Sequence, residues 1–116
     1  FFQANGIRHP LIEHLQTQET YVTNNLMLGD GKTMDGLLLY GTNAVGKTSL
    51  IRAIGINLTM AQCGMYVPCS SFNYAPYHTI YTRILGNDNI FKGMSTFDVE
   101  MSELLKIILK KVSIID

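Results

Sequence analysis

The chain has 116 residues, of which 47% are hydrophobic and 16% charged, a composition typical of a globular domain and unlike that of a disordered segment. Nine basic and nine acidic residues give a formal charge of zero, which excludes an electrostatic nucleic-acid-binding surface on this part of the protein. No apolar run approaches the roughly 18 to 20 residues that span a bilayer, so we expect no membrane partner.

In chain order, the first 30 residues mix short apolar runs with turn-forming pairs and predict short strands or loops. Residues 37–40 form a fully apolar run that ends at Gly41, which predicts a central parallel strand buried on both faces. Residues 48–63 are apolar almost all round and predict a buried helix that ends at Gly64. Extended pieces are predicted at 66–67 and 79–82, because Pro68 and Pro76 exclude a helix between them.

The clearest helical pattern lies near the end of the chain. Its apolar residues recur at the spacing of one helical face: Phe97, Met101, Leu104, Leu105, Ile108 and Val112. Ser95 would cap this helix, with Asp98 completing a capping box.

Between the predicted strand and the first predicted helix lies the segment Gly41-Thr42-Asn43-Ala44-Val45-Gly46-Lys47-Thr48, which fits the phosphate-loop pattern G-x-x-x-x-G-K-[ST]. The glycines let the backbone curl so that N–H groups point at an anion, and the helix adds its positive end. In this pattern Lys47 reaches the β and γ phosphates, and the Thr48 hydroxyl binds Mg²⁺. The loop therefore predicts an α/β P-loop fold with ATP and Mg²⁺ as cofactors, although kinases, GTPases, helicases and ABC-type ATPases all share it.

Several segments resemble, in the same order, motifs of the MutS family of DNA mismatch repair ATPases. They are Arg8-His9-Pro10, Tyr21-Val22-Thr23-Asn24, the G-T-N-A-V-G-K-T-S of residues 41–49, the M-A-Q-C-G-M-Y-V-P of residues 60–68, Thr82-Arg83-Ile84 with Asp88, and the G-M-S-T-F-D-V-E-M of residues 93–101. The resemblance runs from about residue 8 to residue 109. Divergent MutS-like proteins of soft-coral mitochondria and giant viruses form the subgroup we favour.

The resemblance implies a partial domain with the parallel sheet of an ABC-type ATPase. Residues 1–116 would be the N-terminal part of a MutS-type ATPase domain, with the phosphate loop at 41–48 and a signature-like helix start at 93–101. The Walker B strand is missing or only begun at 112–116, where Asp116 is either its aspartate or unrelated. Both chain ends accordingly look like interior positions of a longer protein.

The resemblance also implies roles for single residues. Tyr21 would stack on adenine or be ordinary packing, and Asn43 would orient phosphate or the attacking water. Ser95 would contact the γ phosphate held by the other subunit of a dimer, or serve only as a helix cap. Arg83 and Asp88 either couple the nucleotide state to the rest of the protein or are solvated loop charges. The expected nucleotide contacts within the loop are Gly41, Thr42, Asn43, Ala44, Val45, Gly46, Lys47, Thr48 and Ser49, with Thr48 on the metal.

For the intact protein, the family implies ATP binding and hydrolysis at composite dimer sites that drive mismatch recognition and conversion to a sliding clamp. Its partners would be mismatched double-stranded DNA, bound through other domains, and a second subunit in a homodimer or MutS-type heterodimer. Two alternatives stay open: another ABC-type DNA-repair ATPase, and an ATP-binding interaction module without turnover. We expect an intracellular protein located with DNA, with the mitochondrion as one option.

The remaining chemically reactive residues predict no further site. Cys63 and Cys69 lack the additional ligands of a zinc site and suit a reducing compartment. His9, His14 and His78 show no metal-binding spacing; His9 is expected to be structural beside Pro10, and the other two to lie at the surface.

Overall fold

The computed structural model describes residues 1–15, 18–32, 34–42, 45–82 and 96–112. The chain divides into two compact units, Phe1–Ile80 and Tyr81–Asp116. The first unit contains five elements: β1 (Phe2–Ile7), α1 (Pro10–Leu15), β2 (Asn24–Leu28), α2 (Lys47–Gln62) and β3 (Ser71–Tyr74). The second contains α3 (Thr96–Val112).

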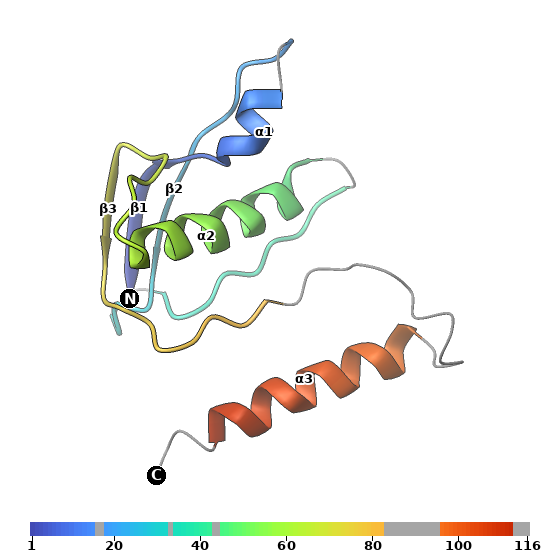
Figure 1. Ribbon diagram of the computed structural model, residues 1–116. Coiled ribbons are helices and arrows are strands. Elements are labelled where there is room, and N and C mark those ends of the chain that lie inside the picture. Colours follow the sequence, from blue (N-terminus) through green and yellow to red (C-terminus); the bar gives the residue numbers. More distant parts are fainter. Residues whose placement is uncertain (16–17, 33, 43–44, 83–95, 113–116) are drawn as a thin grey trace. The chain divides into compact units, whose positions relative to one another are not determined.

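The strands of the first unit form a three-stranded antiparallel sheet in the order β2-β1-β3 (Figure 1). Because β1 is central, its backbone is paired on both sides. In Figure 1, α2 lies across one face of this sheet. Leu58 of α2 joins the buried core formed by Phe2, Ala4 and Ile7 of β1, and Leu50 and Ile54 pack against it.

A β-bulge in β1 decides which of its side chains reach the core. Phe2 pairs with Leu28 and Ala4 with Leu26, but the register shifts by one residue before Ile7 pairs with Asn24. Alternation alone would place Ile7 on the face opposite Phe2 and Ala4, since side chains of a strand point to alternate faces. The extra residue reverses the alternation, so Ile7 is buried together with them.

The predicted parallel sheet is wrong. The three paired strands among the described residues are all antiparallel, and residues 37–40 form no strand. Leu38 and Tyr40 are 85% and 88% exposed. An apolar run predicts burial only if neighbouring strands supply backbone partners and covering layers, and the described residues place none beside this run.

The predicted helices are confirmed more closely than the predicted strands. The helix expected at 48–63 is α2, and Gly64 follows its end with a φ of 72°. Its burial was overestimated, because only Ala53, Asn57 and Leu58 are buried. No helix lies between Pro68 and Pro76, as expected, but the strand there is β3 rather than the extended pieces predicted at 66–67 and 79–82.

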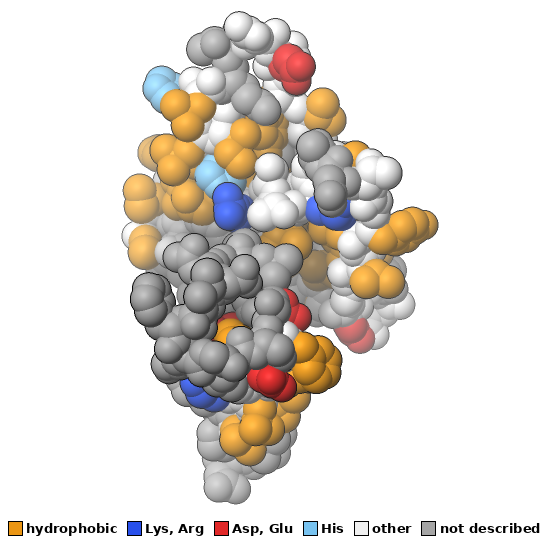
Figure 2. Space-filling model, turned by 90° about the vertical axis from the view of Figure 1, so that its right-hand side faces the viewer, with side chains coloured by type: hydrophobic (Ala, Val, Ile, Leu, Met, Phe, Trp, Pro, Cys, Tyr) orange, Lys and Arg blue, Asp and Glu red, His pale blue; other side chains and the backbone are white. Residues whose placement is uncertain are grey.

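In the second unit, α3 confirms the predicted C-terminal helix. Its apolar residues Phe97, Met101, Leu104, Leu105 and Ile108 are exposed. Figure 2 shows hydrophobic side chains, in orange, at many points on the surface it presents. None of the described helices has the length and apolar character needed to cross a membrane.

Candidate functional site

The candidate site is the loop that leads into α2. Gly46 immediately precedes the helix with a φ of 92°, a left-handed conformation that other residues rarely adopt. A Cβ placed on Gly46 would meet no described atom within 4 Å. The glycine is therefore required by backbone conformation, and it leaves open space beside the start of the helix.

The Lys47 side chain folds back over this loop. Its Nζ donates a hydrogen bond to the Gly41 carbonyl oxygen at 2.7 Å and a second to the carbonyl oxygen of Thr42. The lysine that follows Gly46 thus contacts the first two residues of the glycine-bounded segment and links its end to its beginning. An anion binding in the loop would compete with these carbonyl groups for the lysine.

The first turn of α2 has backbone N–H groups that could donate hydrogen bonds to a ligand. Its first intrahelical bond runs from Leu50 N to Gly46 O at 2.9 Å, and no described side chain caps this end. The N–H groups of the first turn have no intrahelical acceptor, and the helix dipole adds partial positive charge. This arrangement suits a phosphate group.

The metal prediction rests on Thr48, whose side chain is exposed in the first turn of α2. Among the described residues, no group of three or more His, Cys, Asp or Glu side chains could hold a metal ion. A single hydroxyl ligand fits Mg²⁺, which usually keeps several waters and is held largely by substrate phosphates.

Part of the predicted site falls outside the described part of the chain. Asn43, Ala44, Arg83, Asp88, Ser95 and Asp116 lie outside the described residues. Their roles stay predictions, as does the capping box between Ser95 and Asp98. Val45 is exposed, and Ser49 is partly buried in the first turn of α2.

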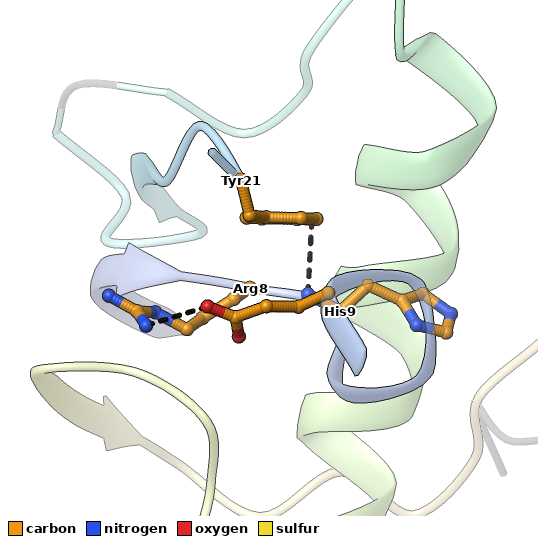
Figure 3. Close-up of polar contacts among 4 residues, drawn as sticks. Arg8, His9 and Tyr21 are labelled. Carbon is orange, nitrogen blue, oxygen red and sulfur yellow. Dashed lines mark hydrogen bonds and ion pairs between the residues drawn. The ribbon is translucent and has the colours of Figure 1, made fainter. Parts of the chain in front are cut away.

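Tyr21, the predicted adenine contact, is held by a backbone hydrogen bond. Its hydroxyl oxygen accepts a hydrogen bond from the His9 N–H at 3.0 Å, and its ring lies over the His9 backbone (Figure 3). His9 is buried, and its Nδ1 accepts a hydrogen bond from Ile12 N at 3.3 Å, so it caps the short helix α1. The structural role expected for His9 is confirmed, as is the exposure of His14 and His78.

An ion pair also joins residues on either side of His9, the residue that contacts Tyr21. Arg8 Nη1 and Glu13 Oε1 lie 2.9 Å apart, a contact drawn in Figure 3. Both side chains are partly exposed, so solvent screens the pair and it contributes little stability. The ion pair connects the residue after β1 with α1.

Asn57 is a further residue of interest that was not predicted from the sequence. This residue is completely buried in α2, where its Nδ2 donates to Ala53 O at 2.7 Å and to Arg8 O at 3.0 Å. A signal was available, because Asn57 is a polar residue on the inward face of a largely apolar helix. Buried polar groups need partners, and a second element usually supplies one.

The glycine-bounded loop, the lysine folded over it and the uncapped helix that follows form a candidate site for a phosphate group. Residues 37–114 match the family described as MutS domain V. The chain belongs to the MutS family, which confirms the resemblance read from its motifs.

Named relatives also match the residues that precede this region. The chain is 45% identical to a mitochondrial DNA mismatch repair protein mutS homolog of Sarcophyton glaucum, over 93% of the chain and 11% of the relative. It is 35% identical to a putative DNA mismatch repair protein mutS homolog of Acanthamoeba polyphaga mimivirus, over 95% of the chain and 12% of the relative. Identity to the DNA mismatch repair protein MSH6 of Saccharomyces cerevisiae is 40%, over 93% of the chain and 9% of the relative. The chain thus spans about a tenth of the length of the curated relatives it matches.

Proposed function

We propose that the intact protein binds ATP and Mg²⁺ at residues 41–49 and uses ATP hydrolysis in DNA mismatch repair. The observation that carries this proposal is the loop Gly41–Thr48 at the uncapped start of α2, inside the region that matches MutS domain V. Residues 1–116 would then be the N-terminal part of the ATPase domain. ATP would supply the phosphate charge that Lys47 and the helix start are suited to bind.

Several parts of this proposal depend on residues or chains beyond the described loop. Asn43 would orient phosphate or water, and Ser95 would reach the γ phosphate of a second subunit. Mismatched double-stranded DNA would bind through other domains, in a homodimer or a heterodimer. The relative named mitochondrial favours the mitochondrion as one location, which fractionation of cells would test.

The test is ATP binding by the intact protein carrying Lys47→Ala, measured by isothermal titration calorimetry. Loss of a charge-assisted contact of about 1.5–3 kcal/mol predicts roughly a 10- to 150-fold weaker affinity. Lys32→Ala is the matched control, because Lys32 is exposed and lies outside the loop. Unchanged affinity in the Lys47 variant would sink the proposal.

A separate measurement decides between an ATPase and a binding module without turnover. Phosphate release by the wild-type intact protein is followed with and without mismatched DNA. We expect mismatch-dependent turnover. Binding without any release would favour the interaction module instead.

A further inference from the structure

Asn57 connects the helix that follows the candidate phosphate loop to the segment that holds Tyr21. Its Nδ2 group donates two hydrogen bonds, one within α2 to Ala53 O and one to Arg8 O at the end of β1. Asn57 is ten positions after Lys47 (57 − 47) in one uninterrupted helix, which fixes their separation along the axis at about 15 Å. The Arg8 backbone is therefore held at a set distance from the loop.

The connection continues through the next residue of the chain. Arg8 is followed by His9, whose backbone N–H donates to the Tyr21 hydroxyl oxygen at 3.0 Å. His9 is itself buried and held by its hydrogen bond from Ile12 N. A continuous set of contacts thus runs from α2 through Asn57, Arg8 and His9 to Tyr21.

Asn57 is fully buried, so the hydrogen bonds of its side chain are shielded from water. Its exposed fraction is 0%, and among the described residues its Oδ1 has no hydrogen-bond partner. A buried amide that leaves one polar atom unsatisfied carries a desolvation cost that an apolar residue would avoid. The contact with Arg8 O gives the amide a positional role that an apolar side chain would not supply.

We infer that Asn57 is a positioning residue that sets the distance between the phosphate-binding loop and Tyr21, and so selects ligands that carry a nucleobase as well as phosphates. The inference rests on the proposed nucleotide site. Removing Asn57 leaves the loop and the start of α2 intact, because these lie almost three helical turns away. It releases Arg8 and His9, and with them the tyrosine that would contact the base.

The experiment compares the affinity of the intact protein for MgATP and for magnesium tripolyphosphate, which has phosphates but no base. Asn57→Leu keeps the side-chain size and removes both donated hydrogen bonds. We expect a loss of about three- to tenfold for MgATP, the range of one net hydrogen bond, with tripolyphosphate affinity kept within about twofold. Thr59→Ala is the control, because the Thr59 hydroxyl donates within α2, to Gly55 O at 2.9 Å.

Tyr21→Phe supplies a second variant that keeps the aromatic ring and removes the hydroxyl that accepts from His9. It should reproduce the selective loss for MgATP. Equal losses for both ligands in Asn57→Leu, or an unchanged preference in both variants, would overturn the inference. If the wild-type protein binds neither ligand, the proposed function itself fails, so the two failures are distinguishable.

Discussion

Gly6 occupies the β-bulge of β1 with a φ of 63°, and its N–H donates to Asn25 Oδ1 at 2.7 Å. A Cβ at this position would lie 2.7 Å from Ser70 Oγ. Two separate penalties thus oppose any larger residue: a left-handed backbone and a steric contact with the segment before β3.

We predict that Gly6→Ala lowers the local stability of the sheet by about 1–3 kcal/mol, the range of one strained backbone position. Hydrogen–deuterium exchange of the intact protein should show faster exchange at the amides of β1. Adding Ser70→Ala should recover only the steric part. Unchanged exchange rates in the single variant would contradict the bulge geometry.

The two cysteines have different surroundings in the first unit. Cys63 is exposed directly after α2, whereas Cys69 is partly buried. Burial raises the pKa of the Cys69 thiol, so less of it is present as the reactive thiolate near neutral pH.

Iodoacetamide at pH 8 should therefore modify Cys69 at least about threefold more slowly than Cys63, because Cys69 is less accessible and burial lowers its own thiolate fraction. Raising the pH should speed the reaction of Cys69 as its thiol ionises. Peptide mapping of the intact protein by mass spectrometry measures both rates. Denaturant should remove the difference, and equal rates in the native protein would argue against the burial of Cys69.

At the scale of elements, α2 is tied to the segment after β3 as well as to the sheet. Gln62 Oε1 accepts from Tyr77 N at 2.8 Å, and its Nε2 donates to Tyr77 O at 3.1 Å. The Tyr74 hydroxyl donates to Ala61 O at 3.0 Å. The Tyr74 bond satisfies a backbone carbonyl at the C-terminal end of the helix, and the Gln62 side chain satisfies both backbone groups of Tyr77.

Gly55 lies inside α2, where a Cβ would meet nothing within 4 Å. We predict that Gly55→Ala stabilises this helix by about 0.5–1 kcal/mol, because glycine has the larger conformational entropy in the unfolded chain. Slower hydrogen exchange across α2 in the intact protein is the measurement. The same chemical change at Gly6 has the opposite expected sign, so each variant is the control for the other.

The elements differ in how far the sequence predicts them. The boundaries of α2 and α3 follow from local signals: helical spacing of apolar residues, and Gly64 as a stop. Residues 37–40 carry an equally strong apolar signal, but a strand exists only if distant segments pair with it, and apolar spacing does not reveal those segments. The bulge at Gly6 was not predicted either, because it depends on Asn25 and Ser70 from elsewhere in the chain.

In the candidate site too, features set by neighbouring residues could be predicted, and features set by distant residues could not. The loop and Lys47 are predicted from their spacing alone, since the motif is contiguous. The roles of His9 and Asn57 depend on contacts across 12 and 49 positions, with Tyr21 and Arg8 respectively. Local patterns can mark such residues as structural, but they do not identify the distant partners.

At the scale of the whole molecule, we propose that the site is shared between two subunits, and this proposal can be tested by mixing variants. Lys47→Ala removes a phosphate contact in its own subunit, whereas Ser95→Ala would remove one from the partner's site. A mixed dimer of the two would keep one complete site, formed by the Lys47 of one subunit and the Ser95 of the other.

We therefore predict that each variant alone loses ATP turnover, and that an equimolar mixture recovers about a quarter of the wild-type sites if subunits of a symmetric dimer exchange freely. Phosphate release by the mixture measures the recovery. Mixing either variant with itself gives the baseline. Failure to recover, with exchange verified, would leave Ser95 as an ordinary helix cap.

Because of the bulge in β1, the set of side chains that face the core also depends on the number of residues in that strand. Deleting the extra residue would restore a regular ladder with Ile7 still facing the core, whereas inserting or deleting a residue between Phe2 and Ala4 would turn Phe2 away from it. Related chains should therefore accept the loss of the extra residue more readily than a change of length between Phe2 and Ala4. A change of length between Ile7 and Arg8 would shift Arg8 relative to Asn57 and, through His9, reach the tyrosine proposed to contact the nucleobase.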